Sequence, residues 1–405
     1  MASRHLWPII CIPVLLIAMS GCGAAPPPEF LYAVTLSGVP NSPSFQLSSF
    51  KVDSSTGVLS PASTTTLGSE IIPSIAVNPA STFLYLSDPS ANAIDIFSIS
   101  PINGAPTGNG AFTPPVIICP FCSVPSSVPG ALALDPSGRF LYYGSSFVGL
   151  GVGLGVVQGI GALAVNSTTG ALSGVAGSPF PADQVPFSVL VHPSGQFVYT
   201  ENANADSSLA SGFSLASISG FAVGSSTGAL APVPGSPFLA PANADVAGFA
   251  MHPSGKFLYA STGQAANGIL AWSVDGATGS LAALPGSPFA AGVATFDPAL
   301  DPGGRFLYVS AGATGGILGF NVDANTGALT PLASSPFSSG TALLGPVVDP
   351  SGRFLFAMDS QNSAIAGFNL DATTGALTAL GNPTSVGAQP ESLTIVKAPQ
   401  VAWLF

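Results

Sequence analysis

The feature that most constrains this chain is a short segment that recurs along most of its length. The copy Asp135-Pro-Ser-Gly-Arg-Phe-Leu-Tyr142 is typical. Related copies begin at Asn78, His192, His252, Asp301 and Asp349, and a truncated copy opens at Phe30. The shared Phe stands at positions 30, 83, 140, 197, 257, 306 and 354, so the period is 48 to 60 residues. Such a period indicates a fold built from seven similar units.

A second motif follows each copy, and Phe320-Asn-Val-Asp-Ala-Asn-Thr-Gly-Ala-Leu329 represents it. Asp-Pro-Ser-Gly and Thr-Gly both carry turn chemistry, and the segments between them are rich in aromatic and β-branched residues. Each unit therefore reads as four short strands, a to d, joined by tight a–b and c–d turns. This pattern predicts an all-β fold, a seven-bladed propeller of four-stranded antiparallel blades.

The two ends of the repeat region predict how the ring closes. The region begins on strand b at Phe30, with no strand a before it, whereas 391–396 (ESLTIV) has the strand-a pattern at the other end. We therefore expect the C-terminal strand to complete the first blade, which leaves no open sheet edge. The predicted organisation is a propeller over residues 29–398 and a tail over 399–405.

The N-terminus predicts export and anchoring. Residues 1–21 contain one Arg, a short apolar run and small residues, as a signal peptide does, and the run is too short to span a membrane comfortably. The end of this segment, Met19-Ser-Gly-Cys22, resembles a bacterial lipoprotein lipobox, which implies cleavage before Cys22 and lipidation of that residue. Residues 22–28 read as a Pro-rich tether. The chain is then held in the cell envelope by its lipid; the alternative is an ordinary signal peptide with a coincidental Cys.

Charge is scarce and sorted. The formal net charge is −11 with only 7 Lys and Arg, which excludes nucleic acid as a partner. In the four-strand unit, the b–c and d–a connections vary and lie at the end opposite the short turns, so function is expected there. We place eight acids at or beside that variable end and no Lys, Arg or His: Glu70, Asp88, Asp183, Glu201, Asp206, Asp245, Asp359 and Glu391.

The paired motifs resemble those of the seven-bladed lactonase-type propellers, which include the 6-phosphogluconolactonase-like and YVTN-repeat proteins. The resemblance covers about residues 29–398 and implies lactone hydrolysis. It also implies Arg and His beside carboxylates to bind an acidic substrate, and no position at the variable end supplies them. No catalytic residue can therefore be carried over, and an uncharged lactone is the substrate that stays open, with a carboxylate as general base or metal ligand.

Four of the acids form a candidate ligand or Ca²⁺ site: Asp183, Glu201, Asp206 and Asp245. Calcium prefers several oxygen ligands, but no Asp-x-Asp-x-Asp loop is present, and solvated loop acids explain the same residues. No other cofactor is indicated. Cys119 and Cys122 are compatible with a disulfide, half a zinc site or a redox motif; outside the cytoplasm the disulfide is favoured.

The remaining polar repeat positions read as scaffold. His192 and His252 occupy the place of Asp in the a–b turn, so we expect them to cap that turn. Arg139, Arg305 and Arg353 share the short-turn end with Asp53, Asp275, Asp323 and Asp371 (listed here by their common register), which predicts salt bridges or a solvated rim. The Gly-rich run 149–161 lacks the strand-then-helix context of a dinucleotide site and reads as an apolar b–c hairpin.

These observations favour a monomeric envelope lipoprotein whose acidic variable end binds a small ligand or a protein. Hydrolysis of a lactone is the alternative, and a purely structural envelope protein is the second alternative.

Overall fold

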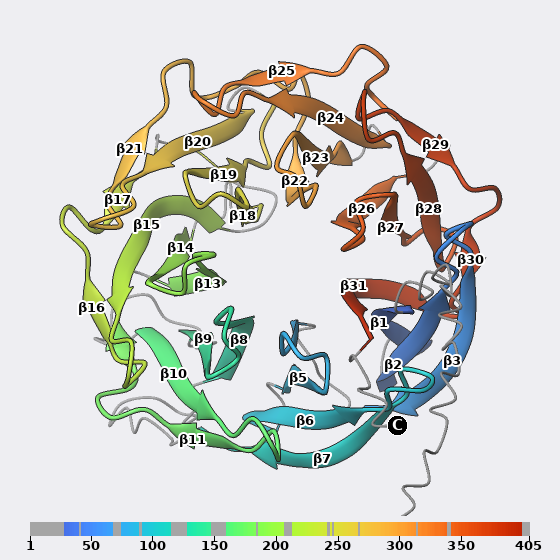
Figure 1. Cartoon of the computed structure of the whole chain (residues 1–405), viewed down its shortest axis with the longest axis horizontal. Coiled ribbons are helices and arrows are strands. Elements are labelled where there is room, and N and C mark those ends of the chain that lie inside the picture. The colour runs from blue at the N-terminus through green and yellow to red at the C-terminus, as the bar shows by residue number, and fades with distance from the viewer. Residues whose placement is uncertain are drawn as a thin grey trace, which may run out of the picture.

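Seven antiparallel sheets stand around a central axis in the computed structural model, like the blades of a propeller (Figure 1). The structure describes residues 28–39, 42–67, 74–88, 91–114, 128–146, 159–183, 185–205, 213–240, 244, 247–265, 268–312, 315–337 and 342–398. No α-helix occurs in these ranges, and none of their elements is a helix with the length and apolarity needed to cross a membrane. The predicted fold class is therefore confirmed.

Each blade has four strands that run from the axis outwards in the order a, b, c, d. Blade 1 contains β31 (Gln389–Lys397), β1 (Glu29–Val39), β2 (Ser42–Val52) and β3 (Leu59–Thr66). Blade 2 contains β4 (Ile75–Val77), β5 (Phe83–Asp88), β6 (Ala93–Ile99) and β7 (Pro106–Phe112). Blade 3 contains β8 (Val128–Leu134), β9 (Phe140–Ser146), β10 (Gly159–Val165) and β11 (Leu172–Gly174). Blade 4 contains β13 (Val185–Val191), β14 (Phe197–Ala205), β15 (Phe213–Val223) and β16 (Leu230–Pro232).

The other three blades repeat the arrangement. Blade 5 contains β18 (Phe249–Met251), β19 (Phe257–Ser261), β20 (Ile269–Val274) and β21 (Leu281–Ala283). Blade 6 contains β22 (Phe296–Leu300), β23 (Phe306–Ser310), β24 (Ile317–Val322) and β25 (Leu329–Pro331). Blade 7 contains β26 (Leu343–Val348), β27 (Phe354–Asp359), β28 (Ala364–Leu370) and β29 (Leu377–Ala379). Three short strands, β12 (Phe180–Pro181), β17 (Phe238–Leu239) and β30 (Thr384–Ser385), pair back onto strand c of their own blades.

The core lies between the blades, because strand b is covered on both of its faces. Alternate side chains of a strand point to opposite faces, so Tyr32 packs toward blade 2 while Leu31 packs toward blade 7. Both side chains are fully buried. The Phe-Leu-Tyr run that identified the repeat is therefore the segment that joins each blade to its two neighbours.

The ring closes as the sequence predicted. Strand β31 pairs antiparallel with β1 from Glu29–Lys397 to Leu36–Gln389, so the C-terminal segment supplies the innermost strand of the N-terminal blade. The backbone N–H of Ala398 also donates to the carbonyl oxygen of Pro28 over 2.7 Å. The two ends of the described chain are thereby held together, and no blade lacks a strand.

Candidate functional site

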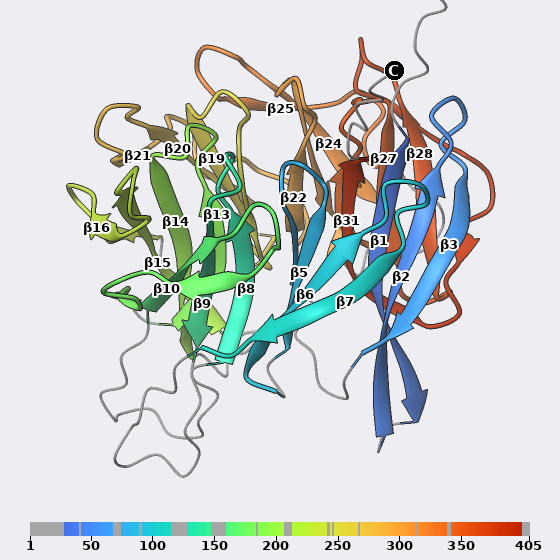
Figure 2. The same cartoon turned by 60° about the horizontal axis from the view of Figure 1, so that its bottom comes forward.

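The two ends of the ring differ in length and chemistry. The a–b and c–d turns are short and lie at what we call the short-turn end, whereas the b–c and d–a connections lie at the opposite end, which we call the mouth. Figure 2 shows β1 and β2 reaching beyond the rest of the ring on the mouth side. All Lys, Arg and His residues of the described chain lie at the short-turn end: Lys51, Arg139, His192, His252, Lys256, Arg305, Arg353 and Lys397.

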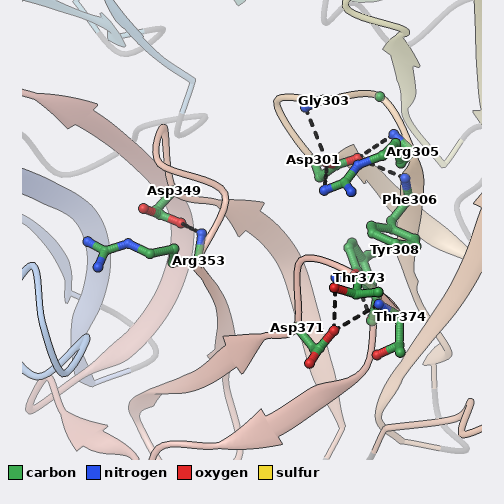
Figure 3. Close-up of polar contacts among 12 residues, drawn as sticks. Asp301, Gly303, Arg305, Phe306, Tyr308, Asp349, Arg353, Asp371, Thr373 and Thr374 are labelled. Atoms are coloured by element: carbon green, nitrogen blue, oxygen red, sulfur yellow. Dashed lines mark hydrogen bonds and ion pairs between the residues drawn. The ribbon is translucent and has the colours of Figure 1, made fainter.

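The acids of the short-turn end are committed to holding turns. Asp301 Oδ1 accepts from the backbone N–H groups of Arg305 (2.6 Å) and Phe306 (2.7 Å), and Oδ2 accepts from that of Gly303 (3.2 Å), as Figure 3 shows. Its side chain also pairs with the guanidinium of Arg305 at 3.8 Å. Asp301 therefore stabilises the a–b turn and has little capacity left for a ligand.

The acids of the c–d turns do the same work. Asp371 Oδ1 accepts from the N–H groups of Thr373 (2.9 Å) and Thr374 (2.8 Å), and these bonds lower its pKa (Figure 3). Arg139 instead donates to the carbonyl oxygen of Ser225 over 2.9 Å. Among the described residues the only ion pair is Arg305–Asp301, so the expected salt bridges between the repeated Arg set and the c–d turn acids do not form, and the solvated-rim alternative holds for these groups.

His192 and His252 cap their turns, as expected, and also join blades. The Nδ1 atom of His192 accepts from the N–H of Ser194 over 3.0 Å, and Nε2 lies 2.9 Å from the carbonyl oxygen of Gly255 in blade 5. His252 reaches Gly304 of blade 6 in the same way at 2.7 Å. Both rings are buried, which supports the scaffold role over a catalytic one.

One groove of about 440 Å³ opens between blades 3 and 4 at the short-turn end. Its polar lining includes Asp135, Ser137 and Arg139. Each of these already holds the backbone or another lining group, since Asp135 accepts from the N–H of Phe140 and Arg139 donates to Ser137 Oγ and Ser225 O. The groove therefore offers shape without free chemistry.

The mouth carries the acids that the sequence placed there. Asp88 and Asp359 end strand b of blades 2 and 7, Asp183 precedes β13, and Glu391 lies near the start of β31. Asp95 of β6 adds another acid at this end, and burial followed by the charge of Asp88 raises its pKa. The mouth is thus acidic over several blades.

Glu201 is the most unusual of these acids. It lies on β14 and is completely buried, at the position where the strands b of blades 2, 5 and 6 have Ser87, Ser261 and Ser310. Ser188 Oγ of the innermost strand donates to its Oε2, whereas Oε1 has no partner. Burial raises the pKa of Glu201 to about 7, the Ser188 bond lowers it, and the charge of Asp297 raises it further.

Asp297 is a site residue that sequence reasoning missed. It lies on β22 in a β-bulge, where Asp297 and Pro298 together oppose a single residue of β23. Its φ is +49°, a left-handed conformation that Asp tolerates better than most residues. The side chain is exposed toward the channel while protein surrounds it, so burial raises its pKa, and the N–H of Gly345 (3.1 Å) partly offsets that effect.

The two carboxyl groups differ in environment. Glu201 is sealed from solvent, but Asp297 is exposed on one side and accepts a backbone N–H. Asp297 therefore ionises first as pH rises, and its charge then holds the proton on Glu201. Carboxyl groups separated in this way can act as a base and an acid in the same pH range.

Asp183 and Glu201, the described half of the predicted calcium site, do not face each other. Asp183 Oδ2 accepts from Ser217 Oγ over 2.8 Å, and Ser217 pairs in register with Asn202. Because Asn202 and Glu201 are adjacent on β14, their side chains point to opposite faces of the sheet. No group of three or more His, Cys, Asp or Glu able to hold a metal occurs within the part of the chain that the structure describes.

Several sequence predictions fall outside the described residues. They concern the signal peptide over 1–21, the lipidated Cys22, the tether up to residue 27, the Cys119–Cys122 pair, and Glu70, Asp206 and Asp245. Most of the Gly-rich run 149–161 lies outside as well. All of these stay predictions.

Comparison with known proteins agrees with the ring. Residues 215–344 and 299–397 match the family model described as Lactonase, 7-bladed beta-propeller. Solved structures of the same shape include a candidate 6-phosphogluconolactonase from Bacteroides fragilis, with a TM-score of 0.69 and 17% identity over 91% of this chain and 98% of that one. A second candidate, from Bacteroides uniformis, has a TM-score of 0.70 and 18% identity over 91% and 99% of the two chains.

The periplasmic gluconolactonase of Pseudomonas aeruginosa is similar to the same degree. Its TM-score is 0.70, with 16% identity over 92% of this chain and all of that one. No curated protein sequence matches the chain. The resemblance to lactonase-type propellers is thereby confirmed, and at these identities the structural likeness establishes the fold alone.

Proposed function

We propose that this protein is an exported, lipid-anchored hydrolase that opens the ring of a lactone carrying no phosphate or carboxylate group. The observation that carries the activity is the pair Glu201 and Asp297, two carboxyl groups with raised pKa values at the mouth of a lactonase-type propeller. The names of the structural neighbours, gluconolactonase and 6-phosphogluconolactonase, support a lactone as the substrate class.

Lactone hydrolysis needs a base for the attacking water and a proton donor for the carbonyl oxygen. Ionised Asp297 accepts a proton as the water oxygen bonds to the lactone carbonyl carbon. Because Ser188 Oγ occupies Oε2 of Glu201, the proton of that carboxyl group resides on Oε1 and is donated toward the carbonyl oxygen as negative charge develops there. A neutral carboxylic acid thus replaces the Arg or His that this end of the ring lacks.

The second half of the reaction returns the proton. Collapse of the tetrahedral intermediate breaks the ring carbon–oxygen bond, and the leaving ring oxygen takes the proton held by Asp297. The product is a hydroxy acid, and both carboxyl groups regain their starting states. Since Glu201 Oε1 is covered in the structure, the mechanism requires that substrate binding uncovers it.

The test is hydrolysis of a panel of uncharged lactones, among them γ-butyrolactone and gluconolactone, followed by proton release. We expect Glu201→Gln and Asp297→Asn each to lower kcat by about 100-fold, the lower range for a general acid or base. Asp323→Asn, at the short-turn end, is the matched control and keeps the parent rate. Turnover that survives both mouth variants unchanged contradicts the proposal.

Ligand binding without turnover, which the sequence favoured, is the second candidate. It is supported by the lack of any Lys, Arg or His in the segments that connect strands at the mouth. A protein that binds lactones but hydrolyses none of the panel supports this candidate over the first.

The anchor adds an orientation to the proposal. Residue 28 lies beside Ala398 at the short-turn end, where the tether joins the ring. A tether over 22–28 reaches at most about 25 Å from the membrane when extended. The short-turn end therefore faces the membrane, and the mouth opens away from it.

A further inference from the structure

We propose that the mouth selects lactones that carry a positive charge, such as an ammonium group beside the ring. This deepens the proposed function, on which the turnover of such a ligand rests, whereas its binding can be measured separately. The argument depends on the charges at the mouth, on how the innermost strands direct them, and on the free oxygen of Glu201.

The charge at the mouth has one sign along the whole sequence. The segments that belong to this end contain ten acids and no cation: Glu70, Asp88, Asp95, Asp183, Glu201, Asp206, Asp245, Asp297, Asp359 and Glu391. The Lys and Arg residues that follow residue 21 all occupy the short-turn end. A concave opening lined by one sign of charge concentrates ligands of the opposite sign and excludes those of the same sign.

Two of these acids are directed by bulges in the innermost strands. Asp297 occupies such a bulge in β22, and Glu391 is the extra residue of a bulge where β31 pairs with β1. Bulges commonly re-aim side chains next to functional sites. The positions on blades 6 and 1 place these carboxyl groups on the wall closest to the axis, as the ring in Figure 1 shows for β22 and β31.

Glu201 supplies an independent sign of a ligand. Its Oε1 is buried without a hydrogen-bond partner, and Asp297 is close enough for its charge to act on Glu201. A buried oxygen of this kind needs a donor, and an ammonium group brings three donors together with the charge that two neighbouring acids require. A carboxylate or phosphate brings neither and adds repulsion.

The experiment uses three γ-lactams of nearly equal size, which resist hydrolysis. They are α-amino-γ-butyrolactam with an ammonium group, γ-butyrolactam with no charge, and pyroglutamate with a carboxylate. Binding to the protein is measured by calorimetry near neutral pH, at low salt and again at about 0.5 M salt, where surface charges are largely screened. We expect the ammonium compound to bind at least about tenfold more tightly than the uncharged one at low salt, with a smaller ratio at high salt.

A matched pair of variants locates the effect. Glu391→Gln removes one charge from the mouth without touching the proposed catalytic pair and should lower the ammonium preference about twofold or more at low salt. Asp323→Asn removes one charge from the short-turn end and should leave that preference unchanged. Equal loss in both variants means that net charge, and not the mouth, sets the preference, and overturns the proposal.

Turnover separates this inference from the proposed function. Equal binding of the ammonium and uncharged lactams overturns the charge preference, even if uncharged lactones are hydrolysed. Selective binding of the ammonium lactam supports the preference, even if α-amino-γ-butyrolactone is not hydrolysed, in which case the hydrolase proposal alone is contradicted.

Discussion

The hydroxyl of Tyr199 donates a hydrogen bond to the carbonyl oxygen of Gly279 over 2.7 Å and so joins blade 4 to blade 5. The same bond links five other blade boundaries, through Tyr32–Gly104, Tyr85–Gly170, Tyr142–Gly228, Tyr259–Gly327 and Tyr308–Gly375. Blade 7 has Phe356 at the equivalent place, facing the turn that contains Gly57. The boundary at which the chain closes on itself therefore has no tyrosine hydroxyl to make this bond.

The tyrosine bonds contribute to stability one boundary at a time. We expect Tyr199→Phe to lower the free energy of unfolding by about 1–3 kcal/mol, because the buried Gly279 carbonyl loses its donor. Chemical denaturation measures this difference. The reverse change, Phe356→Tyr, adds a hydroxyl at the closing boundary and should raise stability by about 1 kcal/mol. An unchanged midpoint for Tyr199→Phe would show that the bond is energetically silent.

The Thr-Gly turn tolerates only glycine at its end. Gly279 has a φ of +75°, and a Cβ there would lie 2.5 Å from the Phe197 ring of the preceding blade. We expect Gly279→Ala to cost about 1–3 kcal/mol from backbone strain, with the clash in addition. Gly276, three residues earlier in the same turn, meets no atom within 4 Å, so Gly276→Ala is the matched control with little effect. Equal denaturation midpoints for the two variants would refute this reading of the turn.

Stability should fall as pH rises from about 4.5 to 7. Glu201 and Glu29 both have folded-state pKa values of about 7, mainly because burial disfavours their charged forms. Between the unfolded value and 7 the folded state binds more protons than the unfolded one, so stability is greatest at low pH and is lost as pH rises. For Glu201 the loss is of the order of 3 kcal/mol, at about 1.4 kcal/mol per pKa unit. We expect Glu201→Gln to flatten the pH dependence of unfolding; a slope identical to the parent's would contradict the burial argument.

Lipidation at Cys22 decides where the protein resides. We expect the parent protein to fractionate with membranes and to incorporate a labelled fatty acid. Cys22→Ser should release it into the soluble exported fraction, because stable anchoring needs the acyl chains that this residue carries. The propeller itself should fold as before, which the denaturation midpoint checks. A Cys22→Ser protein that stays on the membrane would mean that another segment holds it there.

The repeat made most of the fold predictable, and burial explains why. The Phe-Leu-Tyr run marks strand b in every blade because that strand is covered on both faces, and the strand-a pattern after Glu391 identified the closing strand. The sequence also sorted Glu201 to the mouth. It did not show that Glu201 and Asn202 face different blade boundaries, because that depends on strand alternation in three dimensions.

Asp297 escaped for a local reason. Phe296-Asp297-Pro298 lies only a few residues before the turn that starts at Asp301 and shares its Asp-Pro pair, so it carries no signal of its own. Only the bulge in β22 shows that its carboxyl group belongs to the mouth. An acid within a predicted innermost strand, where the other copies have apolar residues or Gly, is the pattern that could have identified it.

The measurement that tests the central claim most directly is the pH dependence of kcat for hydrolysis of an uncharged lactone. The account requires Asp297 ionised and Glu201 protonated, so activity should rise as Asp297 loses its proton and fall as pH passes about 7, where Glu201 ionises. In Glu201→Gln the residual activity should lose that upper fall. A rate that keeps rising through pH 8 in the parent protein, or an unchanged upper limb in Glu201→Gln, would contradict the assignment of Glu201 as the proton donor.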